Sequence, residues 1–320
     1  MPFGAPWSGV GKGSGCINGK TGVVYADWGG RPFFFKFVNS AESIVEFYYD
    51  TLRVTDVHMK CARYLELVAL CLSDGGIGFS SDTMYIHFTN SSEILLDLFR
   101  DEIRRFSRAK IHEQRKPRGT TLRVFDKQLV SSLLEISPSY RTRPCNHFPL
   151  CPVYSQPNRD RFGFHNHFIF KSQVFAEITV PEELVPTQND KAQFMKIYSS
   201  CDGYPSIFPR QQSWSAVERM VAVVCHHPRL KQRLHEILSD LDVPHRIKQY
   251  SLEMRSQEAI SRFKERIGFV EGVTMTGNSR YWRSYQKNEV LDIIQKSYGV
   301  RFDSRNRSEI IARLKKLSRI

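Results

Sequence analysis

Apolar and polar residues follow one another along the chain in a pattern that predicts helices and strands in a recurring order. Residues 59–74 are largely apolar and contain no helix breaker, so they predict a buried helix that ends on Asp74. Gly75 stands where a left-handed C-terminal cap would follow. The elements predicted next are a strand hairpin over 77–90, an amphipathic helix over 91–106, and a strand followed by a helix over 120–137.

The same order of elements begins again further along the chain. Residues 192–209 predict a helix that runs into Asp202 and Gly203. Residues 217–243 predict a strand and an amphipathic helix, and residues 251–269 predict a strand or turn and another helix. The chain therefore contains one unit twice: a helix ending in Asp-Gly, a hairpin, a helix, more strand and a helix.

The remaining segments divide the chain into domains. Residues 21–38 predict two strands around a Gly-Gly turn, residues 40–52 predict an amphipathic helix, and residues 138–190 are rich in proline and predict a long connection. We expect an N-terminal extension at 1–55, a first repeat at 56–140, a connecting segment at 141–190, a second repeat at 191–300 and a C-terminal helix at 301–320.

Composition adds a charge signal to this picture. The chain has 46 Lys and Arg residues against 33 Asp and Glu, a formal net charge of +13, which indicates a polyanionic partner. A generally basic protein without such a partner is the alternative. The seven cysteines form no C-x-x-C pair and no apolar leader follows the first Met, so we expect a reduced, intracellular setting. No run approaches the roughly 18 apolar residues of a membrane span, and the absence of an Arg-rich transit segment favours prokaryotic cytoplasm over an organelle.

Two short stretches carry a resemblance to a known family. The sequences LVALCLSDG at 67–75 and MKIYSSCDG at 195–203 resemble the nine-residue signature of the LAGLIDADG homing endonucleases, in the single-chain form with two motifs. The resemblance extends over about residues 58–295. It implies an α+β fold of two pseudo-twofold-related αββαββα subdomains, with curved antiparallel sheets that bind DNA.

In this family small residues let the two motif helices approach closely. Here they are Ala69 and Ser73 in the first copy and Ser199, Ser200 and Cys201 in the second. Two larger residues of the second copy, Lys196 and Tyr198, are unusual for a packed seam, so we expect them to point outward or to extend along its surface.

If the motif helices pack side by side, Asp74 and Asp202 arrive at the same end. Two carboxylates about 4 Å apart repel by roughly 4 kcal/mol at an effective dielectric near 20, and the helix C-termini add negative potential. A hard divalent cation such as Mg²⁺ (or Mn²⁺) would relieve this, with the carbonyls of Ser73 and Cys201 as further ligands. The alternative is a pair of helix ends exposed to water.

The resemblance implies a function for such a site. It implies metal-dependent hydrolysis of both strands of a long, asymmetric double-stranded DNA target, leaving 3′ overhangs, by a monomeric, intron-encoded and freestanding endonuclease. Two alternatives stay open. One is a relative that binds intron RNA and assists splicing without cutting, and the other is a DNA-binding regulator on the same scaffold.

Further candidate residues lie around the acids. Asn90 and His226 occupy the two predicted strand-to-helix junctions, where the family places polar residues that order water, although helix capping explains Asn90 equally well. Basic residues are also expected near the acids. Lys287 is the candidate in the second half, and Arg141 is the nearest counterpart in the first.

DNA contacts are expected from the strands, because a two-stranded ribbon fits the major groove. The expected segments are 76–88, 204–222 and 274–287, and the candidate DNA-binding residues are Arg210, Gln211, Gln212, Arg219, Arg280 and Arg283. For each of them a solvated surface position is the alternative. A zinc site is a competing interpretation of one further cluster, although its spacings match no standard pattern: Cys145, His147, Cys151, His165 and His167.

Overall fold

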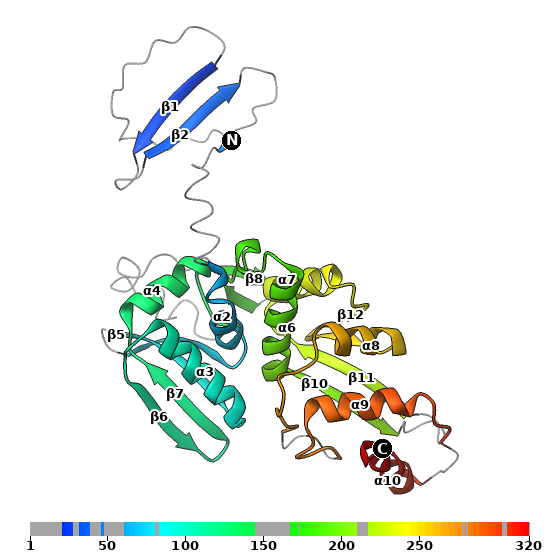
Figure 1. The fold of residues 1–320 in the computed structure, drawn as a ribbon. Coiled ribbons are helices and arrows are strands. Elements are labelled where there is room, and N and C mark those ends of the chain that lie inside the picture. Colours follow the sequence, from blue (N-terminus) through cyan, green and yellow to red (C-terminus); the bar gives the residue numbers. More distant parts are fainter. Residues whose placement is uncertain are drawn as a thin grey trace. The chain divides into compact units, whose positions relative to one another are not determined.

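The structure is a computed structural model, drawn in Figure 1, and it divides the chain into two compact units, residues 1–58 and 59–320. No helix in the described part of the chain is both long and apolar enough to cross a membrane. The described residues are 21–27, 32–38, 46–47, 61–80, 83–144, 167–171, 173–209, 217–276, 279, 281–302 and 306–319.

The N-terminal unit contains one antiparallel sheet in the order β1-β2-β3. Strands β1 (Thr21–Asp27) and β2 (Pro32–Val38) form the hairpin predicted over 21–38. The prediction of a helix over 40–52 is wrong at Glu46–Phe47, which form strand β3 and pair with β2. The aromatic and β-branched residues around β3 suit a strand as well as a helix. The rest of that segment lies outside the described residues.

The larger unit contains two copies of one αββαββα arrangement. Their sheets have the corresponding strand orders β4-β5-β7-β6 and β10-β11-β13-β12, so the predicted fold class is confirmed. The first copy consists of α2 (Leu65–Leu72), β4 (Gly75–Ser80), β5 (Thr83–Asn90), α3 (Glu93–Phe106), β6 (Ile111–Lys116), β7 (Gly119–Val124) and α4 (Lys127–Ile136). The second consists of α6 (Gln188–Asp202), β10 (Gly203–Pro209), β11 (Val217–Val224), α7 (Pro228–Asp240), β12 (Arg246–Ile247), β13 (Ser251–Met254) and α8 (Gln257–Arg266).

Helices α2 and α6 pack against each other where the two copies meet, and Figure 1 shows them side by side with one sheet on either side. Seven of the eight residues of α2 are buried, which explains its nearly continuous apolar sequence. The small residues Ala69 and Ser199 are fully buried, as the close approach of two helices requires. Closer to the N-terminal ends of the two helices, Gln193 Nε2 donates to Glu66 Oε1 at 3.0 Å.

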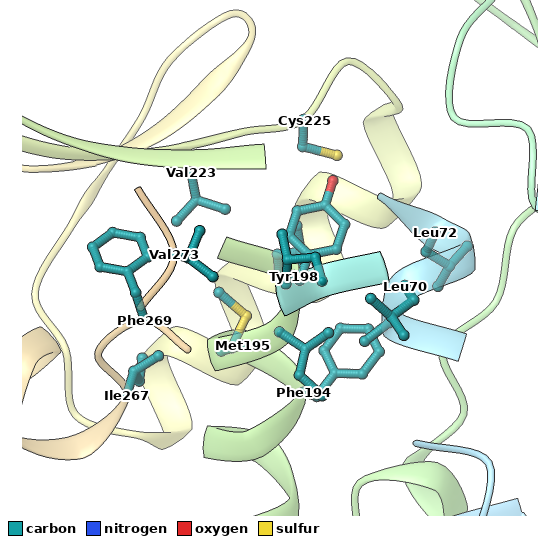
Figure 2. Close-up of a cluster of buried hydrophobic side chains, with 14 of the residues drawn as sticks. Leu70, Leu72, Phe194, Met195, Tyr198, Val223, Cys225, Ile267, Phe269 and Val273 are labelled. Atoms are coloured by element: carbon teal, nitrogen blue, oxygen red, sulfur yellow. The ribbon is translucent and has the colours of Figure 1, made fainter. Parts of the chain in front are cut away.

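Tyr198 does not point outward as predicted. Its side chain is 1% exposed, and its hydroxyl donates to the carbonyl of Val224 at 3.3 Å. Figure 2 shows the ring among apolar side chains, with its hydroxyl directed toward Cys225. The prediction was wrong because α6 buries two faces, one against α2 and one against its own sheet. Lys196, in contrast, is only partly buried.

The glycine after each acid is required by a close approach rather than by a left-handed cap. Gly75 and Gly203 do not have a positive φ, so the predicted left-handed cap is wrong. A Cβ at Gly75 would lie 2.8 Å from Cys71 Cα, and one at Gly203 would lie 2.6 Å from the carbonyl oxygen of Ser199. Each strand therefore turns back directly against the helix that precedes it.

The remaining elements follow the two copies or connect them. Helix α10 lies within the predicted C-terminal segment 301–320, whereas α9 was not predicted. These elements are the hairpin β8 (His167–Phe170) and β9 (Gln173–Ala176), the 3₁₀ turn η2 (Glu182–Leu184), α9 (Lys287–Ser297), α10 (Arg307–Lys316) and the 3₁₀ turn η3 (Leu317–Arg319).

We expect Gly203→Ala to lower the free energy of unfolding by about 1–3 kcal/mol, because the new methyl group has to displace backbone atoms. Gly299→Ala is the matched control, since a Cβ there meets no atom closer than 3.9 Å. Urea unfolding followed by circular dichroism measures both variants. Equal stabilities of the two variants would contradict the close approach.

Candidate active site

The C-terminal ends of α2 and α6 open into one cavity that both copies line. Its volume is about 860 Å³. Asp202 ends α6 and Asp74 lies two residues beyond α2, and both are in the cavity wall. Of the site residues predicted from the sequence, the structure thus brings together the two acids, Asn90 and Lys287.

Asp202 is a buried acid with too little positive charge around it. Burial raises the pKa of its carboxyl group to about 7, and the neighbouring carboxyl group of Asp74 adds to the rise. The positive charges of Lys287 and Arg143 act in the opposite direction without restoring the ordinary value of 3.8. The pair therefore favours a retained proton or an added cation.

Asp74 occupies a more polar position than Asp202. Burial also raises its pKa, but Lys287, a hydrogen bond from Asn90 and Arg143 oppose the rise. Asn90 Nδ2 donates to Asp74 Oδ2 at 2.7 Å, while Asn90 Oδ1 accepts from the backbone N–H of Ser92 at 2.8 Å. Asn90 therefore orients the acid and forms a turn before α3, whereas the N-cap of α3 is Ser92; the water-ordering role stays a prediction.

Lys287 is a buried lysine in the first turn of α9. Its Nζ donates to the carbonyl oxygens of Ser200 at 2.7 Å and Gly203 at 2.6 Å. Burial lowers its pKa to about 8, although Cys201 and the two acids act in the opposite direction. The ammonium group therefore satisfies carbonyls at the negative end of α6 and supplies positive charge to both acids.

The first-half basic residue is Arg143 rather than the predicted Arg141. Arg143 lowers the pKa of both acids, while Arg141 donates to the carbonyl of Pro144 at 3.4 Å. Both lie in the irregular segment after α4, where helical and strand periodicity give no indication of which side chain faces the cavity. Sequence reasoning could therefore place the basic residue only to within a few positions.

The structure does not bring His226 to the acids. Gly75 pairs with Phe88 and Gly203 pairs with Val223, so the residue equivalent to Asn90, two places further on, is Cys225. His226 is exposed, with its ring 5.0 Å from that of Tyr250. The predicted correspondence between His226 and Asn90 was wrong by one residue, because apolar runs alone do not fix the strand pairing.

The donor set fits a hard cation only in part. Among the described residues no group of three or more His, Cys, Asp or Glu side chains could hold a metal ion. Two under-neutralised carboxylates nevertheless suit Mg²⁺ or Mn²⁺, which keep several waters and take substrate oxygens as ligands. The Ser73 hydroxyl is engaged with the carbonyls of Ala69 and Leu70, and burial raises the pKa of the Cys201 thiol. The backbone carbonyls of Ser73 and Cys201 stay predicted ligands.

The zinc interpretation falls mostly outside the described residues. Cys145, His147, Cys151 and His165 belong to the segment that the structure does not describe. His167 starts β8, where its backbone pairs with Ala176. The described part of the chain therefore offers nothing in support of a zinc site.

The predicted DNA-binding residues divide into three groups. Arg210, Gln211, Gln212 and Arg280 lie outside the described residues. Arg219 is tied to the end of α9: its Nε donates to Ser297 Oγ at 2.7 Å and its Nη2 to the Ser297 carbonyl at 2.8 Å. These two hydrogen bonds make Arg219 a structural anchor, and burial lowers the pKa of its guanidinium group.

Arg283, in contrast, is exposed and lines a second hollow of about 850 Å³ together with Arg118 of the first copy. This hollow shares Ser91, Arg118 and Thr276 with the acid cavity. The expected DNA-facing strand over 274–287 is wrong in the described part of that segment, where the chain makes only an isolated bridge between Thr274 and Gln286.

Comparisons with known proteins return structural similarities only. No protein-family model and no curated protein matches the sequence. The solved structure of I-DmoI in complex with DNA and Mn is similar at a TM-score of 0.40 and 14% identity, over 65% of this chain and 97% of that one. The LAGLIDADG meganucleases I-AabMI and I-CpaMI, each bound to uncleaved DNA, are similar at TM-scores of 0.43 and 0.44 and identities of 11% and 10%. They cover 79% and 80% of this chain and 97% of each of those chains.

The buried acids predict a pH-dependent stability. The pKa of Asp202 is raised to about 7 in the folded chain, so between about pH 4 and pH 7 the unfolded chain loses this proton and the folded chain keeps it. In EDTA the contribution of Asp202 to the free energy of unfolding should therefore fall over this window, whereas His227, whose pKa burial lowers to about 4, contributes in the opposite direction. Asp202→Asn should remove this contribution while that of Asp74 remains, and the variant should exceed the wild type in stability by a few kcal/mol at pH 8.

Urea unfolding at pH 4 and pH 8 measures this difference, with the exposed Asp101→Asn as the matched control. Mg²⁺ at pH 8 should stabilise the wild type more than Asp202→Asn. Parallel pH curves for wild type and Asp202→Asn would show that Asp202 ionises at its ordinary pKa.

Proposed function

We propose that the chain is a LAGLIDADG-type homing endonuclease that cuts both strands of a long DNA duplex with a divalent metal. The observation that carries the proposal is the convergence of Asp74 and Asp202 in one cavity, each at the end of an equivalent helix. Two acids on duplicated elements provide one hydrolytic group for each strand of a duplex. Because a single chain supplies both acids, the enzyme acts as a monomer.

The residues around the acids have separable tasks in this proposal. When bound, Mg²⁺ or Mn²⁺ activates a water and stabilises the departing 3′ oxygen of the phosphodiester. The carboxylates of Asp74 and Asp202 would hold the metal, and Asn90 fixes the orientation of Asp74 through its 2.7 Å hydrogen bond. Lys287, held by two carbonyls, supplies positive charge next to the phosphate without leaving its position.

A duplex also needs a basic surface around the cut. Arg118 comes from the first copy and Arg283 from the segment between α8 and α9; both are exposed and have no ion-pair partner among the described residues. They line the hollow that adjoins the acid cavity, where phosphates on either side of the cleaved bond would pass. The net charge of +13 favours the same partner. Since the two copies differ in sequence, the target is asymmetric.

Cleavage of a plasmid library in Mg²⁺ tests the proposal. The wild type should linearise DNA at a discrete site and leave short 3′ overhangs. Asp74→Asn and Asp202→Asn should each lower the rate of double-strand cutting by about a hundredfold or more, since each removes charge that stabilises one transition state. Asp101→Asn, on the exposed face of α3, should cut as the wild type does.

The same assay separates the alternatives. Tight binding of structured intron RNA without any DNA cleavage would indicate the splicing factor. Specific duplex binding that both acid variants retain, again without cleavage by the wild type, would indicate the DNA-binding regulator.

A further inference from the structure

The segment between α8 and α9 begins and ends against α6. Near its start, the backbone N–H of Val270 donates to Ser200 Oγ at 2.7 Å. At its end, Lys287 Nζ donates to the carbonyl of the same Ser200 at 2.7 Å and to that of Gly203 at 2.6 Å. Both ends of the segment therefore meet at the last turn of α6, which ends on Asp202.

Asn288 joins these two ends to each other. Its Oδ1 accepts from the backbone N–H of Phe269 at 3.0 Å, and its Nδ2 donates to the Phe269 carbonyl at 3.0 Å. Nδ2 also donates to Glu271 Oε2 at 3.1 Å. A side-chain amide that pairs with both backbone groups of one residue fixes that residue in distance and in direction. The residue next to Lys287 is therefore tied to the chain that leaves α8.

Asn288 does not act as a cap for its own helix. It is the second residue of α9, and the N-cap residue Gln286 makes no side-chain capping hydrogen bond. Asparagine near a helix start commonly bonds to the backbone of its own helix, but here its amide is turned to Phe269 and Glu271. Its hydrogen bonds therefore stabilise the join between two segments rather than the start of α9.

The chain reaches Asn288 through a left-handed glycine. Gly268 has a φ of 63°, and its backbone N–H donates to the carbonyl of Phe263 at 2.8 Å, which closes the end of α8. Phe269 follows with its side chain 2% exposed, and Figure 2 shows its ring within a cluster of buried hydrophobic side chains. Lys287 Nζ lies 5.4 Å from the centre of this ring. Asn288 therefore fixes both the backbone that carries the lysine and the ring beside its ammonium group.

The outer part of the segment has an anchor that does not involve Asn288. Trp282 Nε1 donates to the carbonyl of Ile207 on β10 at 2.8 Å, and the side chain of Trp282 is 2% exposed. Its ring also packs against that of Tyr285, with 5.4 Å between the ring centres. Arg283, which lines the second hollow, follows this anchor directly. A change at Asn288 should therefore leave the basic surface in place.

On the basis of the proposed function, we propose that Asn288 is a positioning residue, which holds the ammonium group of Lys287 beside the two acids. A lysine side chain is a flexible stem of four carbons, so its hydrogen bonds define one position only while the backbone at its root stays fixed. The three hydrogen bonds of Asn288 supply that fixation one residue away. A displacement of about 1 Å at a catalytic site can lower a rate about a hundredfold.

Nuclear magnetic resonance of protein that contains isotope-labelled lysine tests the inference without any cleavage. The buried ammonium group of Lys287 should exchange slowly with water and give a signal of its own, which Lys287→Met identifies by its loss. Asn288→Ala should shift or broaden this signal. The matched control is Asn189→Ala, since Asn189 is likewise the second residue of a helix but is exposed, at the end of α6 away from Asp202.

Cleavage under single-turnover conditions measures the consequence for the reaction. Asn288→Ala should lower the rate of cutting by about tenfold to a hundredfold, while the dissociation constant for the target in EDTA stays within about twofold of the wild-type value. In a Lys287→Met background the same substitution should have less than about a twofold effect, because the group that it positions is absent. Thermal melting shows whether each variant is folded.

The outcomes separate this inference from the proposed function. A wild type without a slowly exchanging Lys287 signal, or a signal that is unchanged in folded Asn288→Ala, would overturn the inference and leave the endonuclease proposal standing. A signal that changes equally in Asn189→Ala, or an additive loss of rate in the double variant, would do the same. A Lys287 signal that depends on Asn288, in a wild-type protein that cuts no DNA, would overturn the endonuclease proposal and leave the positioning of the lysine standing.

Discussion

The packing of α2 against α6 is the constraint on which the larger unit depends. Buried apolar and small side chains fill the seam, and Gly75 and Gly203 let each following strand turn back against its helix. Because this packing fixes the ends of both helices, Asp74 and Asp202 lie in the wall of one cavity and are largely removed from water. The raised pKa of both carboxyl groups is the electrostatic cost of that geometry.

A buried lysine makes this arrangement tolerable in the absence of a ligand. Lys287 satisfies the carbonyls of Ser200 and Gly203 and places a positive charge near both acids. Lys287 and Arg143 together do not restore the ordinary pKa of Asp202, so the site retains an affinity for further positive charge. Functional sites commonly hold such uncompensated groups, because the surrounding packing is strong enough to keep them in place.

The two copies share their topology but not their chemistry. At equivalent positions the first copy has Asn90 and the second has Cys225. Packing constrains only the volume and polarity of the buried side chains, so outward positions and cavity positions were free to differ. The duplication therefore supplies a symmetric frame, and the asymmetry of the site is added by individual side chains.

Apolar periodicity was sufficient to predict the repeated order of elements and the two acids with their glycines, whereas Lys287 became a candidate through the family resemblance. These features are local, since a helix, a turn and the residue that ends them are encoded by neighbouring positions. Strand pairing and helix packing decided the rest: Cys225 in place of His226, the burial of Tyr198 and the anchoring of Arg219 to α9. Each of these depends on a register between segments far apart in the chain, and a shift of one residue in a strand moves a side chain to the opposite face.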